Sequence, residues 1–164
     1  MLIFIDTEFT DFRNPQLISI ALVSDCGAHE FYAELPFDLG RCNDFVVATV
    51  LPLLGEPANA TCQPAELDHR LRIWLAQFEG RGEVAICYDF DGDWRFLCAA
   101  LGDEIPGWIV PRNIFKYLDK QKLQSYFADK LQAAHHALHD ARANRHAFDH
   151  DKARRDPMRF RKSR

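Results

Sequence analysis

Three short apolar segments within the first 35 residues constrain the fold of this chain most strongly. Residues Leu2–Asp6 and Leu17–Ser24 are rich in aliphatic side chains, and residues His29–Leu35 alternate between polar and apolar side chains. Runs of this length and pattern are typical of β-strands. Asp25-Cys26-Gly27, between the second and third runs, has the composition of a tight turn. The first third of the chain therefore predicts three strands in an antiparallel meander.

A segment with the periodicity of an amphipathic helix follows the three predicted strands. Apolar side chains at 67, 71, 74, 75 and 78 share one face of a helix that Pro64 can begin. A strand, a helix and a further strand come next, an order that favours a right-handed crossover. The other predicted elements are a short helix at 45–54, a strand at 83–88, a helix near 94–101, a strand at 108–110, and helices at 121–132 and 137–152. These patterns predict one α/β domain with a mixed sheet over residues 1–153, followed by a basic tail over residues 154–164.

Composition excludes several classes of protein. The chain has 164 residues, of which 48% are hydrophobic and 27% charged, unlike disordered, collagenous or coiled-coil sequences. No apolar run approaches the ~20 residues that cross a bilayer, and the short, acidic opening is unlike a signal peptide. The five cysteines contain no C-x-x-C pair, which argues against a disulfide framework or a zinc knuckle. We therefore expect a cytoplasmic protein that makes no membrane contact.

Charge is distributed unevenly along the chain. The formal net charge is -4, but the last eleven residues carry six basic side chains against Asp156, a local charge of +5. The remaining 153 residues therefore carry -9. An acidic body suits binding of cations, and a basic tail suits binding of phosphates.

The first candidate metal-binding motif is Asp6-Thr7-Glu8, at the end of the first predicted strand. Alternate residues of a strand point to the same face, so both carboxylates can approach one cation. The competing interpretation is a polar strand end with two solvated acids.

The second motif places Asp89, Asp91 and Asp93 between a buried strand and a helix. Acids at a helix N-terminus stabilise the helix by ~0.3 to 1 kcal/mol, and Asp is a good cap. Capping accounts for one of these acids more readily than for three at alternating positions, so a metal-ligating role is predicted for at least one.

The third motif runs from His135 to Asp140. If both were helical, their side chains would lie about 140° apart, so His135 can join Asp140 only from a loop before the helix. His136 would share a helical face with Asp140. The alternatives are a structural His-rich helix, or a zinc site that includes His146 and His150, which are also four residues apart.

The order of these motifs resembles the DEDDh (DnaQ-like) 3'-5' exonuclease superfamily. Further segments resemble the bacterial exoribonuclease branch typified by RNase AS, and the similarity covers nearly the whole chain except the tail. These segments are Asp6-Thr7-Glu8-Phe9, Leu17-Ile18-Ser19-Ile20, Tyr32-Ala33, Val50-Leu51-Pro52, Tyr88-Asp89 and His135-His136-Ala137-Leu138-His139-Asp140-Ala141. Phe9 follows the motif glutamate where proofreading exonucleases usually have threonine, which favours the RNA-directed branch.

The resemblance implies an RNase H-like exonuclease fold, with a mixed central β-sheet and flanking helices. It also implies two Mg²⁺ ions, for which Mn²⁺ can substitute, and His135 as the general base. Asp93 is preferred within the middle motif because it precedes Phe96-Leu97 with the spacing of the family, although Asp89 and Asp91 remain alternatives. The implied metal ligands are Asp6, Glu8, Asp93 and Asp140.

The expected substrate is single-stranded nucleic acid with a free 3' end, RNA in preference to DNA, and the expected products are nucleoside 5'-monophosphates. Phe9 and Thr10 follow the first acidic motif, where a terminal base can stack on an aromatic ring. Burial of Phe9 in the core is the alternative. The related exoribonucleases suggest a homodimer. Other hypotheses are a DNA-directed exonuclease, a non-catalytic nucleic-acid-binding module, and a metal-dependent phosphatase or nucleotide hydrolase.

Overall fold

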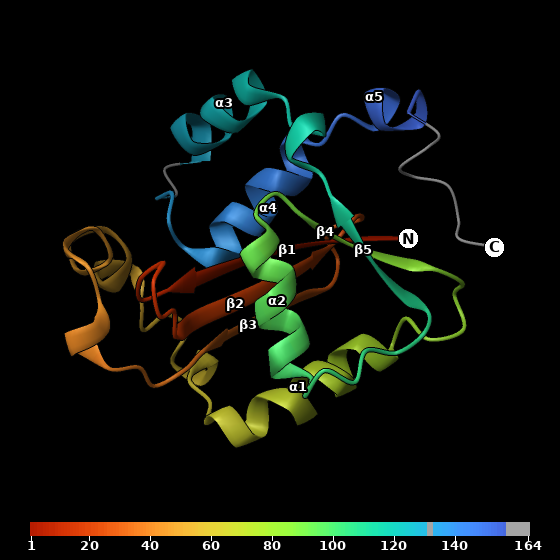
Figure 1. Cartoon of the computed structure of the whole chain (residues 1–164). Coiled ribbons are helices and arrows are strands. Elements are labelled where there is room, and N and C mark those ends of the chain that lie inside the picture. The colour runs from red at the N-terminus through yellow and green to blue at the C-terminus, as the bar shows by residue number, and fades with distance from the viewer. Residues whose placement is uncertain (131–132, 157–164) are drawn as a thin grey trace.

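A mixed sheet of five strands forms the centre of the computed structural model, which describes residues 1–130 and 133–156 (Figure 1). The strand order is β3-β2-β1-β4-β5. The strands are β1 (Leu2–Phe9), β2 (Leu17–Ser24), β3 (Glu30–Glu34), β4 (Val84–Tyr88) and β5 (Ile109–Asn113). Strands β1, β2 and β3 pair antiparallel, whereas β4 is parallel to both β1 and β5. The predicted antiparallel meander and mixed sheet are confirmed.

Helices cover both faces of this sheet. The α-helices are α1 (Pro64–Ala76), α2 (Asp91–Ala100), α3 (Lys120–Lys130), α4 (Ala137–Ala147) and α5 (His150–Arg154). The shorter helical turns are η1 (Leu39–Arg41), η2 (Val46–Val50), η3 (Leu51–Leu53), η4 (Ala58–Ala60) and η5 (Phe115–Tyr117). Helix α1 begins at the predicted Pro64, where the side chains of Gln63 and Glu66 form a reciprocal capping box.

The alternation of side chains along β1 assigns its residues to two layers. Ile3 and Ile5 pack with apolar residues of α1 and α2, including Leu71 and Leu97. Phe4 points to the opposite face and packs there with buried residues of β4, η5 and the end of α4. Successive strand residues therefore reach different helices, and this alternation continues through the acidic end of the strand.

Helix α4 lies close against β1 and β2 because the contact is made of small side chains. Ala137 and Ala141 of the helix pack on Ala21 of β2, and all three residues are fully buried. Ala21 is paired with Asp6 across the two strands. The N-terminal turns of α4 are consequently held beside the end of β1 that carries the acids.

The structure differs from the sequence prediction in two helical segments. Residues 137–152 form two helices, not one, because Phe148 takes an extended conformation and pairs with Leu118 in an isolated β-bridge. The Asp149 side chain then accepts a hydrogen bond from the backbone N–H of Lys152 and begins α5. The predicted helix at 45–54 is a π-helical turn followed by a 3₁₀ turn.

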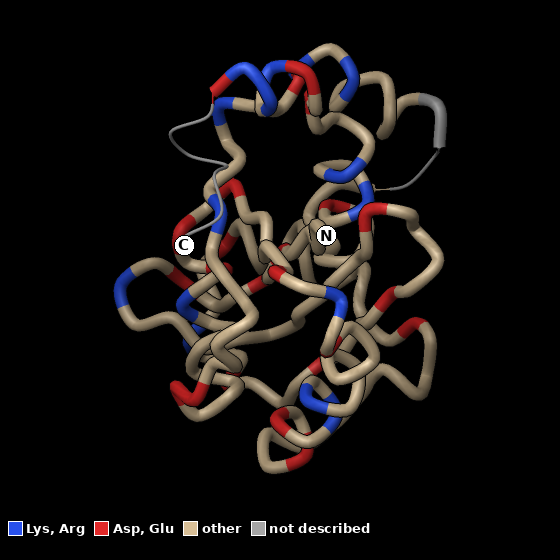
Figure 2. The backbone as a smooth tube through the Cα atoms, turned by 90° about the vertical axis from the view of Figure 1, so that its right-hand side faces the viewer, with Lys and Arg blue, Asp and Glu red and all other residues tan. Residues whose placement is uncertain are grey.

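Of the predicted basic tail, residues 157–164 lie outside the described residues. Helices α3 and α5, which both contain basic residues, lie at one end of the molecule, at the top of Figures 1 and 2. Within residues 1–130 and 133–156, no helix has the length and apolar character needed to span a membrane.

Candidate metal centre

The first two acids of the site project from the end of β1 on its α4 side. Asp6 and Glu8 are two residues apart in a continuous strand, so their side chains share a face. Thr7, between them, points to the opposite side and donates a hydrogen bond from Oγ1 to Oδ1 of Asp93, at 2.7 Å. Strand β1 therefore presents the carboxylates of Asp6 and Glu8 on its α4 side. On its other side, Thr7 holds the carboxylate of Asp93, which belongs to α2.

The third acid, Asp140, comes from the first turn of α4. The backbone N–H of His135 donates a hydrogen bond to its Oδ2, at 2.8 Å. His135 lies in the loop before the helix with φ of 68°, in the left-handed region that non-glycine residues seldom occupy. This hydrogen bond ties the loop conformation of His135 to the position of the Asp140 carboxylate.

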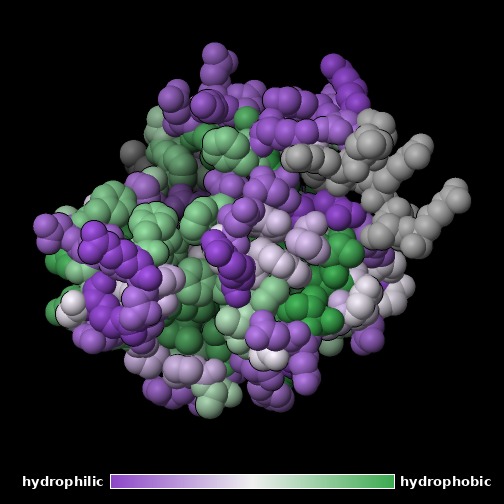
Figure 3. Space-filling model, viewed as in Figure 1, coloured by the Kyte–Doolittle hydropathy of each residue, from purple (hydrophilic) through white to green (hydrophobic). Residues whose placement is uncertain are grey.

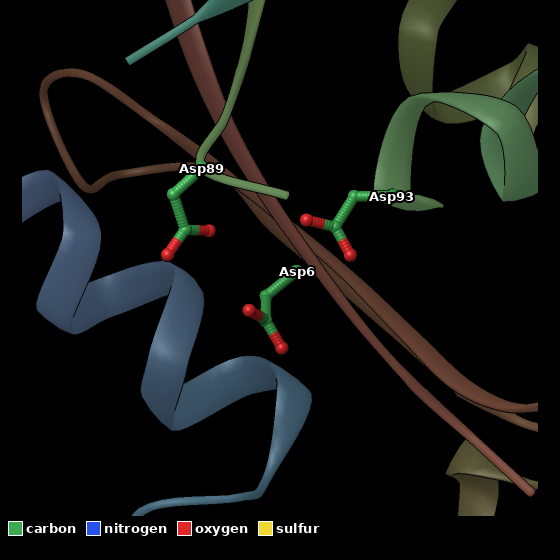
Figure 4. Close-up of side chains that lie close together, drawn as sticks. All are labelled: Asp6, Asp89 and Asp93. Atoms are coloured by element: carbon green, nitrogen blue, oxygen red, sulfur yellow. The ribbon is translucent and has the colours of Figure 1, made fainter. Parts of the chain in front are cut away.

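Two further acids are Asp89, directly after β4, and Asp93, in the first turn of α2 (Figure 4). Asp93 is 2% exposed, and its Oδ2 has no hydrogen-bond partner among the described residues. Asp89 is half-buried and accepts a hydrogen bond at Oδ1 from the Asn144 side chain of α4, at 3.1 Å. Figure 4 shows that the side chains of Asp6, Asp89 and Asp93 lie close together beside β1.

These five acids form two sets of three that share Asp6. Asp6, Asp89 and Asp93 offer oxygens within 4.8 Å of one another, and Asp6, Glu8 and Asp140 do the same. Carboxylate oxygens are the ligands that Mg²⁺ and Mn²⁺ prefer. The unpaired buried oxygen of Asp93 and the two sets of acids fit divalent cations.

Crowding and burial favour protonation of these acids while no cation is bound. Burial, and next the carboxylates of Asp140 and Asp93, raise the pKa of Glu8 from 4.5 to about 8. Burial is also the largest cause that raises the pKa values of Asp6, Asp89, Asp93 and Asp140 above their usual range. A bound cation would reverse this preference by stabilising the charged form.

Asp6, Glu8 and Asp140 line a cavity of about 290 Å³, and His135 lines it as well. The exposed His135 ring makes an edge-to-face contact with Phe45, at 4.9 Å between centroids. The imidazole is therefore placed beside the acidic centre while it remains open to solvent. Such a group can exchange a proton with a water molecule in the cavity.

A second, larger cavity of about 610 Å³ adjoins the first, and Phe9, Phe12 and Phe90 line both. The Phe9 ring is stacked with Phe90 at 5.9 Å and lies edge-to-face with Phe12 at 5.0 Å. Phe12 is 76% exposed. The apolar surface beside α2 is visible to the left of centre in Figure 3. We call Phe9, Phe12 and Phe90 the aromatic platform.

Gly92 makes room for one member of this platform. A Cβ at Gly92 would lie 2.1 Å from a ring carbon of Phe90, far inside contact distance. Glycine therefore lets the Phe90 ring lie over the first turn of α2. The sequence contains no periodic signal for Phe12 or Phe90, because both belong to non-repetitive segments where side-chain direction depends on the loop.

Several predicted residues lie away from the cavities. Thr10 is fully buried, and its hydroxyl accepts a hydrogen bond from the backbone of Gln16, so its side chain does not line the predicted substrate site. Asp91 is exposed and accepts a hydrogen bond from Asn113. His136 is buried against Tyr32, and burial is the main cause that lowers its pKa to about 4. Of the described residues, only carboxylates form groups of three or more that could hold a metal ion.

The chain matches no protein-family model, and no curated protein matches its sequence. In three dimensions it is similar to the nuclease domain of 3'hExo, a DEDDh family member, which was solved bound to rAMP. The superposition has a TM-score of 0.58 and 11% sequence identity, and it covers 96% of this chain and 91% of that chain. The mixed five-stranded sheet with flanking helices is therefore the RNase H-like fold of a DEDDh nuclease domain.

Proposed function

We propose that this chain is a divalent-metal-dependent 3'-5' exonuclease that hydrolyses single-stranded RNA to nucleoside 5'-monophosphates. The observation that carries this proposal is a cluster of carboxylates from Asp6, Glu8, Asp93 and Asp140. Three of these acids, all except Asp93, line a cavity that His135 also lines. The fold of the chain, similar to that of a nuclease domain, supports the same conclusion.

The four carboxylates of this proposal would hold two Mg²⁺ or Mn²⁺ ions. When bound, such a pair would supply positive charge at the phosphodiester, at the attacking water and at the leaving oxygen. Thr7 keeps one oxygen of Asp93 fixed and leaves the other for a cation. The backbone of His135 does the same for Asp140.

His135 acts as the general base in this proposal. His135 lines the same cavity as Asp6, Glu8 and Asp140 and is exposed, so its ring can take the proton of a water molecule and release it to solvent. His136 is a poorer candidate because it is buried and stacked on Tyr32.

The aromatic platform binds the bases at the 3' end of the strand. Phe9 joins the two cavities, and the exposed face of Phe12 offers a stacking surface beside the acids. Stacking is available to every base, and unpaired bases are free to take part. Unpaired RNA is therefore the proposed substrate, and the rAMP bound to the similar nuclease domain is a nucleotide of the proposed product class.

The decisive experiment uses a 5'-labelled RNA oligonucleotide with Mg²⁺. We expect a ladder that shortens from the 3' end, loss of the ladder in EDTA, and slower hydrolysis of the matched DNA. A second RNA with a blocked 3'-hydroxyl should resist degradation. Degradation of the blocked strand from its 5' end would refute the polarity, and a bound but intact strand would indicate a non-catalytic binding module. Equal rates on RNA and DNA would refute the RNA preference.

A further inference from the structure

We propose that Asp89 is a fifth metal-ligating carboxylate and that Asn144 positions it, so that both divalent ions bind before nucleic acid arrives. This inference rests on the proposed two-ion centre and extends it. Four acids are implied by the family resemblance, whereas five converge in the structure. The fifth acid changes which protein groups hold the second ion.

The spacing of the acids separates the centre into two ion sites. Two ligand oxygens on one Mg²⁺ are ~3 to 4 Å apart, because each lies ~2.1 Å from the ion. The oxygens of Asp6, Asp89 and Asp93 lie within 4.8 Å of one another, so small side-chain rotations bring them onto one ion. The set of Asp6, Glu8 and Asp140 has the same spacing. Asp89 thus gives the second ion a third protein carboxylate.

The unpaired oxygen of Asp93 is an independent sign of a cation at this position. Its Oδ1 accepts the hydroxyl of Thr7, but its Oδ2 is buried with no partner among the described residues. A buried oxygen without a hydrogen-bond partner destabilises the folded state, and the desolvation penalty is larger for a charged carboxylate than for a neutral polar group. In Figure 4, Asp89 at the end of β4 and Asp93 at the start of α2 lie on either side of Asp6. A cation between the three carboxylates would satisfy that oxygen.

Asn144 gives Asp89 a defined place in the centre. Asn144 is 4% exposed, and its Nδ2 donates the hydrogen bond to Asp89 Oδ1. It lies four residues after Asp140 on α4, so both side chains lie on one helical face. One face of α4 therefore supplies a carboxylate to the first set and fixes a carboxylate of the second.

Asp91 provides an internal contrast. It is an acid of the same segment, two residues after Asp89, but it is exposed and held by Asn113 of β5. It belongs to neither set of clustered acids. The pairs Asp89–Asn144 and Asp91–Asn113 are chemically matched, and only the first adjoins the centre.

The test is a titration of the full chain with Mn²⁺ in the absence of nucleic acid, followed by the electron paramagnetic resonance of free Mn²⁺. Wild type should bind two ions. Asp89→Asn should bind one, with the second weakened by at least ~100-fold, because a charged ligand is removed. Asp91→Asn should still bind two. Retention of both ions by Asp89→Asn, with affinities within twofold of wild type, would overturn the inference.

Asn144→Leu should weaken only the second ion, by ~10- to 100-fold, as expected for the removal of a group that orients a ligand. Asn113→Leu is its matched control and should leave both affinities unchanged. An unchanged second affinity in Asn144→Leu would remove its positioning role.

Failure of this inference can be distinguished from failure of the proposed function. Wild type that binds fewer than two ions without nucleic acid overturns the inference, while Mg²⁺-dependent shortening of RNA from the 3' end would still support the function. Wild type that binds two ions but leaves RNA intact contradicts the nuclease proposal alone.

Discussion

The electrostatic cost of the acidic centre should appear as a stability penalty that Glu8→Gln removes. Glu8 has a pKa raised from 4.5 to about 8 by burial and by the carboxylates of Asp140 and Asp93. Between these two pH values the folded chain binds more protons at Glu8 than the unfolded chain does. The free energy of unfolding therefore decreases as pH rises through this window, and the penalty is fully developed above pH 8.

The size of this effect follows from the pKa difference. A shift of one unit corresponds to 1.36 kcal/mol, so the full shift sets an upper bound of about 5 kcal/mol. Glu8 is only half-buried, and solvent screening reduces the expected penalty to about 1 to 2 kcal/mol. For a chain of this size, 1 kcal/mol moves Tm by ~2 to 4 °C. Glu8→Gln should therefore raise Tm by roughly 2 to 8 °C at pH 8 in EDTA.

Divalent ions should remove the higher Tm that Glu8→Gln has over wild type in EDTA. Mg²⁺ at one hundred times its Kd stabilises the folded state by ~2.7 kcal/mol, and hence raises the wild-type Tm by roughly 5 to 11 °C. Glu8→Gln lacks one ligand and should gain much less. The assay is calorimetry from pH 4.5 to 8, with EDTA or Mg²⁺. Glu79→Gln is the control, because Glu79 is exposed just after α1. A Glu8→Gln variant less stable than wild type at pH 8 in EDTA, or an undiminished response to Mg²⁺, would refute the reasoning.

Four further outcomes are expected. Alanine at a proposed ligand of the four-carboxylate set should nearly abolish hydrolysis of labelled RNA, whereas Asp91→Ala should retain it. An inactive Asp91→Ala together with an active Asp93→Ala would assign the metal-ligating role to Asp91. His135→Ala should reduce turnover by ~10² to 10⁴ with Mn²⁺ binding intact, and an unchanged rate would exclude it as the base. Phe12→Ala should raise KM by ~5- to 160-fold at unchanged Tm, since stacking contributes ~1 to 3 kcal/mol per base; an unchanged KM would show that the aromatic platform does not bind substrate. Deletion of residues 157–164 should weaken substrate binding, with saturated turnover unchanged. The slope of log K against log salt concentration should become shallower by ~0.7 for each phosphate contact that is lost, and an unaltered slope would exclude these residues from substrate binding.

The regular elements could be predicted because local pattern and tertiary contact agree in them. The aliphatic runs of β2 and β4 are buried, and the periodic face of α1 packs into the main core. The break between α4 and α5 could not be predicted in the same way. It depends on the pairing of Phe148 with Leu118, which is thirty residues earlier in the sequence.

Sequence spacing identified the acids but not the relations between them. The separation of Asp6 from Glu8 is fixed by strand geometry alone, so their shared face could be predicted. Asp89 and Asp91 differ in position because each accepts a hydrogen bond from a different asparagine. Asp89 is bonded to Asn144 of α4, and Asp91 to Asn113 of β5. Burial of the Thr10 hydroxyl likewise depends on closure of its loop by Gln16. These contacts are made only when separate segments have docked.

The assembly of the centre from β1, the start of α2 and α4 determines when it can exist during synthesis. Asp140 is added 134 positions after Asp6, roughly 7 to 27 s later at a rate of ~5 to 20 residues per second. Throughout that interval the nascent chain lacks α4, so no Asp140 can join Asp6 and Glu8 of β1. A fragment that ends before this helix lacks Asp140 and Asn144 together. Incomplete translation products would therefore lack the proposed two-ion centre and, with it, the proposed nuclease activity.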